Sequence, residues 1–225
     1  MIRAVIFDFD GVIANSEPLH FRAYRDVLAD RGLVLTERDY YDRYLGYDDI
    51  GAFRAIASDR GVALAEADIA DLVARKAVRL EVLERSASVL FPGARDAIVR
   101  MAAAWPTAIA SGALKAEILR VLEHESLRVH FPVVVSAEDT PASKPDPAPY
   151  LLAVDLLGAF TPGLRPEECV AIEDSRWGLQ SARDAGLRTV AITHTYPASA
   201  LEGVADIVIP HLDRFTTELV AALAR

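Results

Sequence analysis

The stretch Arg3-Ala4-Val5-Ile6-Phe7-Asp8-Phe9-Asp10-Gly11-Val12 decides the fold of this chain. It begins with an uninterrupted apolar run, which is typical of a parallel β-strand buried on both faces. The run ends at two aspartates spaced i, i+2, a spacing that turns both carboxylates to the same side of an extended backbone. Ligands of open α/β sheets bind beyond the carboxyl ends of the strands, so Asp8 and Asp10 are the first candidate site residues. The alternative is that the two aspartates only cap a turn.

The composition describes an ordinary globular protein. The chain has 225 residues, of which 52% are hydrophobic and 25% charged, and its net charge is −9. This charge disfavours binding to nucleic acid or to an anionic membrane. The single Cys169 excludes an internal disulfide and fits a reducing compartment. No apolar stretch reaches membrane-spanning length, and Met1-Ile2-Arg3 leads straight into a strand rather than a signal peptide. We therefore expect a cytoplasmic protein that binds neither nucleic acid nor membranes.

A helical segment follows the first strand. Helical spacing of apolar residues predicts four helices, at about 17–32, 36–44, 48–60 and 66–85, with Gly46 and Gly61 between them. No strand-like run occurs between Ile13 and Ser88. Residues 15–87 are therefore predicted to form an all-helical cap domain. The predicted cap and core account for the apolar residues without leaving a clear apolar stripe for an interface between subunits. A monomer or a weak homodimer is therefore expected.

The rest of the chain alternates between helices and short β-branched strands. Strands are predicted at 107–110, 133–136, 169–172, 189–192 and 207–209, with helices between them. Repeated βα units of this length predict an α/β fold with a doubly wound, Rossmann-like parallel sheet. Residues 1–14 and 88–225 would form this discontinuous core.

Two later strand ends carry single polar groups. Ser111 and Gly112 follow the strand at 107–110 and offer a hydroxyl and backbone N–H groups to an anion. The alternative for Ser111 is a plain helix N-cap. Lys144 lies in a loop stiffened by Pro145 and Pro147, where it can hold a phosphoryl oxygen or pair with a carboxylate. Its alternative is a solvated loop lysine.

Glu173 and Asp174 end a second apolar strand. Since they are neighbours, only one of them can face Asp8 while the backbone is extended. Carboxylate oxygens without a nearby histidine or cysteine cluster favour Mg²⁺ over zinc. The alternative is an ordinary helix start with acids near the positive end of the helix dipole.

The order Asp-x-Asp, Ser, Lys and Glu-Asp, each after a predicted strand, resembles the haloacid dehalogenase (HAD) superfamily of phosphotransferases. The resemblance covers the whole chain, including the helical C1 cap after the first strand. The segments 8–14 and 16–23 look like the beta-phosphoglucomutase and sugar-phosphatase branch.

The resemblance implies a role for each candidate residue. Asp8 would be the nucleophile that forms an aspartyl-phosphate, and Asp10 would be the general acid and base. Mg²⁺ would bind Asp8, the backbone carbonyl of Asp10, and Asp174, with Glu173 as a direct or water-mediated partner. Phosphate would be held by Lys144, Ser111 and the backbone N–H groups of Phe9, Gly11 and Gly112.

The resemblance to the beta-phosphoglucomutase branch also concerns residues of the cap. His20 matches a histidine that, in beta-phosphoglucomutase, couples cap closure to the general acid; packing between cap and core is an equal alternative. Where the mutase has a lysine and the arginine that grips a second phosphate, this chain has Leu45 and Asp49. Lys76 is a candidate for supplying that charge, although a solvated helix face beside Arg75 and Arg79 is the favoured interpretation.

The expected function is a Mg²⁺-dependent phosphatase acting on a small phosphorylated metabolite, with a sugar phosphate as the expected class. A phosphosugar mutase of the beta-phosphoglucomutase kind is the alternative. A catalytically silent binding module on the same fold is the third hypothesis.

Overall fold

The protein is described by a computed structural model that covers residues 1–45, 47–86 and 88–224. Gly46, between two cap helices, and Ala87, at the predicted end of the cap, lie outside the described residues. The chain divides into two compact units, Met1–Asn15 with Val89–Arg225 and Ser16–Ser88. We call them the core unit and the cap unit. Each boundary differs by one residue from the expected one, because the backbone N–H of Asn15 donates to the carbonyl of Val89 at 2.7 Å and ties both to the core unit.

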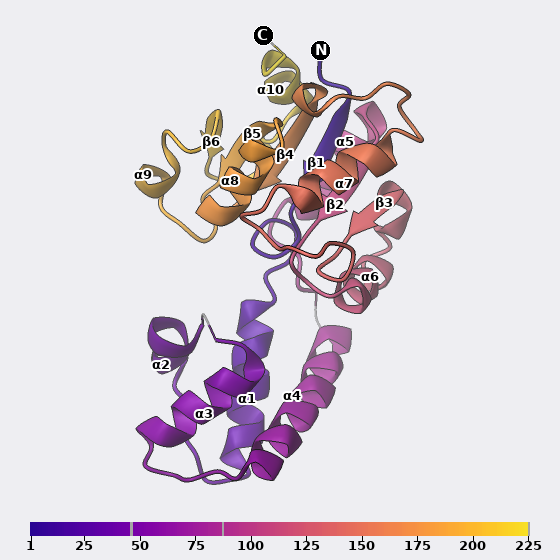
Figure 1. Cartoon of the computed structure of the whole chain (residues 1–225). Helices are drawn as coiled ribbons and strands as arrows, with labels where there is room; N and C mark the ends of the chain where they lie inside the picture. The colour runs from indigo at the N-terminus through magenta and orange to yellow at the C-terminus, as the bar shows by residue number, and fades with distance from the viewer. Residues whose placement is uncertain (46, 87, 225) are drawn as a thin grey trace. The chain divides into compact units, whose positions relative to one another are not determined.

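The core unit is built on six parallel strands (Figure 1). They are β1 (Ala4–Phe7), β2 (Thr107–Ala110), β3 (Val133–Val135), β4 (Cys169–Glu173), β5 (Arg188–Ile192) and β6 (Ile207–Ile209). The strand order is β3-β2-β1-β4-β5-β6, which is the Rossmann order. The predicted doubly wound α/β fold is therefore confirmed.

Helices cover both faces of this sheet. The core helices are α5 (Ala94–Ala104), α6 (Lys115–His124), α7 (Ala148–Leu157), α8 (Arg176–Asp184), α9 (Ala198–Leu201) and α10 (Thr217–Ala222). Short 3₁₀ turns lie at Arg128–His130, Pro166–Glu168 and Leu212–Arg214. Ile6 of β1 belongs to the buried cluster that includes α7 and α8 (Figure 1). Phe7 points to the opposite face, where its ring meets Phe131 and Phe215 edge-on at 5.7 Å.

The continuous apolar run of β1 is explained by this packing. All four of its residues are buried, and the strand pairs with β2 on one side and β4 on the other. A strand covered on both faces has no solvated side on which polar residues would alternate. The pairing with β4 also places the end of β1 where the strand order reverses, which is the usual ligand position in such sheets.

The cap unit is helical throughout its described length. It contains α1 (Glu17–Ala29), α2 (Glu37–Asp39), a π-helical turn (Tyr40–Tyr44), α3 (Asp49–Asp59) and α4 (Glu66–Ser86). The helix predicted at 36–44 is thus half π-helical. Phe53, Ile56 and Leu72 are fully buried in the centre of this unit.

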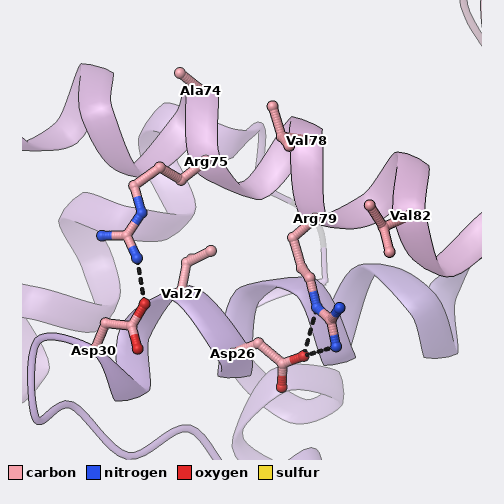
Figure 2. Close-up of a pocket in the computed structure, with 8 residues that line it drawn as sticks. All are labelled: Asp26, Val27, Asp30, Ala74, Arg75, Val78, Arg79 and Val82. Carbon is pink, nitrogen blue, oxygen red and sulfur yellow. Dashed lines mark hydrogen bonds and ion pairs between the residues drawn. The ribbon is translucent and has the colours of Figure 1, made fainter.

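A groove of about 590 Å³ runs between α1 and α4 on the cap unit (Figure 2). Val78 and Val82 line it at successive turns of α4. Arg79 pairs with Asp26 at 2.7 Å, and Arg75 pairs with Asp30, so two ion pairs join the helices across the groove. These contacts hold α1 against α4. None of the acidic residues at the strand ends of the core unit lines this groove.

Within the part of the chain that the structure describes, no helix has both the length and the apolar character needed to cross a membrane.

Candidate active site

The backbone turns sharply just after β1. The N–H of Asp8 still donates to the carbonyl of Ile172 in β4 at 3.0 Å, which continues the strand pairing to this residue. Beyond it, the carbonyl of Phe9 accepts the N–H groups of Ile13 and Ala14 at 2.8 and 2.9 Å. Asp8 is consequently buried at the strand end, while Asp10 lies exposed on the turn.

Three carboxylates meet at the carboxyl ends of β1 and β4. Asp8, Glu173 and Asp174 are buried, and each offers an oxygen within 4.8 Å of the others. Burial, followed by the charge of Glu173, raises the pKa of Asp8 well above its usual value. The same two causes raise the pKa of Asp174 to about 7. Burial and mutual repulsion thus disfavour the ionised forms of Asp8 and Asp174 when no cation is bound between them.

Lys144 lies among these acids. Its Nζ is 2.8 Å from Oδ1 of Asp8 and 2.6 Å from Oε1 of Glu173. Burial opposes its positive charge, but Asp8 and Glu173 outweigh burial and raise the pKa of Lys144. The loop that carries the lysine is fixed to α8, because Ser181 Oγ donates to the carbonyl of Asp146 at 2.6 Å. Lys144 is thus a buried, permanently charged ammonium group rather than a solvated loop lysine.

Glu173 is saturated with hydrogen bonds. Its Oε1 accepts from Lys144 and from the hydroxyl of Tyr150 at 3.0 Å. Its Oε2 accepts from the N–H groups of Asp174 and Ser175 and from the Ser175 hydroxyl, at 3.1 to 3.2 Å. A carboxylate has about four lone-pair positions, so these five donors leave little capacity for a metal ion. The geometry favours Glu173 as the residue that orients Lys144.

Asp174 is held differently. Its Oδ2 accepts a hydrogen bond from Thr195 Oγ1, and it packs directly against Gly11. Gly11 has φ of +79°, and a Cβ added there would lie 2.0 Å from Asp174 Oδ2. Asp174 therefore takes its position because residue 11 has no side chain, and from there it offers an oxygen within 4.8 Å of an oxygen of Asp8. An oxygen-only, negatively charged, buried donor set fits Mg²⁺.

Gly11→Ala is expected to weaken Mg²⁺ binding by about 10-fold or more, as displacement of groups around a metal site does. The added methyl group would displace Asp174, and the positive φ would add backbone strain. Isothermal titration with Mg²⁺ measures the effect. Gly163→Ala is the matched control, since Gly163 has φ of +71° with open space around it. It should cost about 1–2 kcal/mol of stability and leave Mg²⁺ affinity unchanged; equal Mg²⁺ affinity in both variants would contradict this account.

Ser111 and Gly112 lie at the end of β2, beside β1. Ser111 is buried, and its Oγ accepts the N–H of Ala113 at 3.1 Å. Helix α6 begins only at Lys115, so Ser111 is not its N-cap. Gly112 is exposed, with nothing within 4 Å of its missing Cβ. This strand end therefore presents a short loop, rather than a helix N-terminus, to any anion.

The two cap candidates lie together within the cap unit. Nζ of Lys76 is 2.7 Å from Asp49 Oδ1 and 3.1 Å from His20 Nδ1. Burial, then the charge of Lys76, lowers the pKa of His20 to about 4. The favoured interpretation of Lys76 as part of a solvated face is wrong, because its exposed fraction is 3%. Lys76 lies one turn from Leu72 and from Leu80, both buried, and Asp49 on α3 neutralises it.

Three residues near the acids were not anticipated: Tyr150, His194 and Thr195. Tyr150 lies in an apolar helix and reads as an ordinary core residue. His194 and Thr195 lie just beyond β5, which ends at Ile192, so the strand-end rule that indicates Asp8 and Ser111 applies to them as well. His194 Nδ1 is 2.8 Å from the carbonyl oxygen of Gly11.

Comparison with known proteins identifies the family. The haloacid dehalogenase-like hydrolase family matches residues 2–186 of this chain. The chain belongs to this family. The predicted superfamily is therefore confirmed, and so is the prediction that the protein is a hydrolase.

Named relatives agree with this assignment. The chain is 30% identical, over 86% of its length and 87% of the relative's, to the phosphorylated carbohydrates phosphatase of Thermotoga maritima. It is 32% identical, over 99% of both chains, to protein CbbY of Rhodobacter capsulatus. It is also 32% identical, over 84% of its length and 95% of the relative's, to the fructose-1-phosphate phosphatase YqaB of Escherichia coli. These two phosphatases support the expected enzyme class, a phosphoric monoester hydrolase.

Solved structures show the same fold. A putative beta-phosphoglucomutase from Thermotoga maritima superposes with a TM-score of 0.82 at 26% identity, covering 97% of this chain and 98% of that one. CbbY from Rhodobacter sphaeroides, in complex with xylulose-(1,5)bisphosphate, superposes with a TM-score of 0.74 at 26% identity, covering 95% and 96%. The predicted resemblance to beta-phosphoglucomutase-like proteins is confirmed at the level of the fold.

Proposed function

We propose that this protein is a Mg²⁺-dependent phosphatase that hydrolyses small phosphorylated carbohydrates through an aspartyl-phosphate at Asp8. The observation that carries the proposal is the pairing of Asp8 with Lys144, beside a second carboxylate at Asp174. A buried aspartate next to a fixed ammonium group can approach a phosphate whose negative charge the ammonium offsets.

In the first step an oxygen of Asp8 attacks phosphorus, and the bond from phosphorus to the sugar oxygen breaks. Asp10 donates a proton to that departing oxygen, so the product leaves as an alcohol. The exposed position of Asp10, two residues beyond Asp8, suits a group that must reach a substrate. Lys144 stays charged throughout and offsets the charge on Asp8 and on the phosphoryl oxygens.

In the second step a water molecule attacks the phosphorus of the aspartyl-phosphate. Asp10, now ionised, takes the proton of this water. The bond between phosphorus and the Asp8 oxygen breaks, which releases inorganic phosphate and restores the Asp8 carboxylate. Glu173 holds Lys144 in place through both steps, and Ser111 with the N–H groups of Phe9 and Gly112 would hold the phosphoryl oxygens. The N–H of Gly11, which was expected to join them, donates instead to the carbonyl of Ala14 at 3.0 Å within the turn.

Mg²⁺ would be held by Asp8, the backbone carbonyl of Asp10, and Asp174, and it would supply charge compensation for the phosphoryl group. The proximity of buried carboxyl groups in the acidic cluster supports this assignment. Two carboxylate charges within 4.8 Å of each other repel by about 3 kcal/mol or more at an effective dielectric constant of about 20.

Asp10→Asn is expected to lower kcat by about 10²–10⁴-fold, which is the usual contribution of positioned acid–base catalysis. An amide keeps the size of the side chain but neither gives nor takes the proton. Phosphate release at saturating substrate and Mg²⁺ measures the loss. An Asp10→Asn enzyme with wild-type kcat on a sugar phosphate would remove Asp10 from the mechanism.

The substrate class rests on relatives and on the cap. Relatives named as phosphatases of phosphorylated carbohydrates and of fructose 1-phosphate support a sugar phosphate as substrate. A mutase must also hold a second phosphate group. The cap cation considered for that role, Lys76, is buried and paired with Asp49, which supports the phosphatase over the mutase.

The deciding experiment measures phosphate release across a panel of sugar phosphates, phosphoglycolate and nucleotides, with Mg²⁺ and with EDTA. The proposal predicts Mg²⁺-dependent release of inorganic phosphate from at least one sugar phosphate. Isomerisation that needs a sugar bisphosphate and releases little phosphate would establish the mutase instead. No turnover of any ester would favour the silent binding module.

A further inference from the structure

His194 and Phe91 both contact the turn that carries Asp10. Nδ1 of His194 lies 2.8 Å from the carbonyl oxygen of Gly11, the residue after Asp10. A carbonyl can only accept a hydrogen bond, so this nitrogen carries the proton and donates it. The N–H of Phe91 donates to the carbonyl of Ile13, in the same turn, at 3.0 Å.

The two contacts are joined to each other. The imidazole of His194 stacks on the ring of Phe91, with centroids 3.9 Å apart and planes 15° from parallel. His194 comes from the segment after β5, whereas Phe91 lies just before α5. Two segments that are remote in sequence thus contact the loop between Phe9 and Ala14 together. Within the loop itself, the carbonyl of Phe9 accepts the N–H groups of Ile13 and Ala14.

We propose that His194 is a positioning residue for Asp10. It fixes the peptide between Gly11 and Val12, one residue beyond Asp10, and with it the direction from which the Asp10 carboxyl group reaches the leaving oxygen. The inference rests on the proposed function, because it assigns His194 to the acid–base step of that reaction. Its contact with Gly11 also lies next to the point where Asp174 packs, so a perturbed metal site is the competing explanation for any loss of activity.

Two substitutions separate the hydrogen bond from the ring. His194→Phe keeps an aromatic ring to stack on Phe91 but loses the donor to Gly11. His194→Asn keeps an N–H donor near the position of Nδ1 but loses the stacking. His124→Phe is the matched control, since this histidine lies on α6 with a side chain that is 43% exposed.

Two substrates separate acid catalysis from other losses. A sugar phosphate needs its leaving oxygen protonated, whereas p-nitrophenyl phosphate releases a stable phenolate without an acid. The measured quantity is kcat/KM, which includes departure of the leaving group, for p-nitrophenyl phosphate and for the sugar phosphate that the wild-type enzyme hydrolyses fastest.

His194→Phe should lower kcat/KM for the sugar phosphate by about 10- to 100-fold, as small misplacements of catalytic groups do. The value for p-nitrophenyl phosphate should fall by about threefold at most, because the acid contributes little to that reaction. His194→Asn should restore most of the sugar-phosphate activity. In an Asp10→Asn background, His194→Phe should cause no further loss, since residues acting in one step are not additive.

Three results would overturn the proposal. The first is an equal loss of kcat/KM on both substrates in His194→Phe, as a disturbed metal or phosphate site would give. The second is an unchanged kcat/KM of His194→Phe on the sugar phosphate. The third is a full additional loss of kcat/KM when His194→Phe is added to Asp10→Asn. Failure of the proposed function looks different, because the wild-type enzyme would then hydrolyse neither substrate. Mg²⁺ titration and thermal unfolding of each variant separate metal loss and misfolding from misplacement of Asp10.

Discussion

Asp8→Asn is expected to abolish phosphate release, by about 10⁴-fold or more, as removal of a catalytic nucleophile does. The amide nitrogen and oxygen of asparagine do not attack phosphorus at a useful rate, so no phosphoenzyme forms. Mass spectrometry after rapid acid quenching should show one phosphoryl group on the wild-type chain and none on Asp8→Asn. A purified, folded Asp8→Asn protein with near wild-type turnover would eliminate Asp8 as the nucleophile.

The same variant should be no less stable than the wild type in the absence of Mg²⁺, because Lys144 keeps its ion pair with Glu173 at 2.6 Å. Burial and Glu173 raise the pKa of Asp8, so its ionised form is less favourable in the folded protein than in the unfolded chain. The folded state then binds the proton more tightly, and stability falls as pH rises through the window above the usual pKa of 3.8. Asparagine removes this contribution, so thermal unfolding of Asp8→Asn should depend less on pH.

Asp139→Asn is the matched control with the opposite sign. Burial raises the pKa of Asp139, but hydrogen bonds from Lys115 and Ser136 outweigh it and lower the pKa to about 2. Its ionised form therefore stabilises the fold above the usual pKa of 3.8, and that stability is lost as pH falls towards 2. Asp139→Asn should lose stability at neutral pH and keep its phosphatase activity. A loss of stability in Asp8→Asn as large as that in Asp139→Asn would contradict the electrostatic account of Asp8.

Lys144→Met is expected to lower both stability and activity. The substitution leaves Asp8, Glu173 and Asp174 buried within 4.8 Å of one another without their ammonium partner. Breaking a buried ion pair by removing one partner typically costs about 3–5 kcal/mol. Denaturant unfolding at neutral pH measures this cost, and Mg²⁺ should stabilise Lys144→Met more than the wild type, because the ion replaces part of the missing positive charge.

The activity of Lys144→Met should fall by about 10²–10³-fold, as when one preorganised electrostatic contact to a transition state is lost. Lys115→Met is the matched control, because the side chain of Lys115 is 42% exposed and pairs with Asp139 at 2.9 Å. Such a pair contributes about 0–1 kcal/mol. If Lys144→Met unfolded and reacted like Lys115→Met, the buried ion pair would not have the role assigned to it.

The strand at Ala4–Phe7 and the helical character of the cap followed from local patterns. A strand covered on both faces is apolar at every position, and an amphipathic helix repeats every 3.6 residues, so both patterns can be recognised in a short window. Polar residues at strand ends also stand out locally, and Asp8 and Asp174 are recognisable in this way. Lys144 does not lie at a strand end, because β3 ends at Val135 and the lysine follows in the loop before α7; only the neighbouring prolines mark it in the sequence. Thr195 and His194 satisfied the same rule after β5 and were overlooked.

Partners of buried polar groups could not be predicted in this way. Lys76 was favoured as a solvated residue, because a lysine flanked by arginines on a helix usually faces water. Its burial depends on Asp49 and His20, which come from other helices of the cap unit. Tyr150 likewise lies in a helix whose apolar sequence is typical of a protein core, and only the fold brings its hydroxyl to Glu173.

The sequence alone predicts a parallel α/β sheet, an inserted helical segment and a set of polar residues at strand ends, because each of these features depends on residues that are neighbours in the chain. Only the tertiary structure decided which strand ends are adjacent. Glu173 and Asp174 lie beside Asp8 because β4 pairs directly with β1 at the point where the strand order reverses. The pairing of strands depends on the packing of the whole sheet, so no local pattern specifies that these acids and Lys144 share one site.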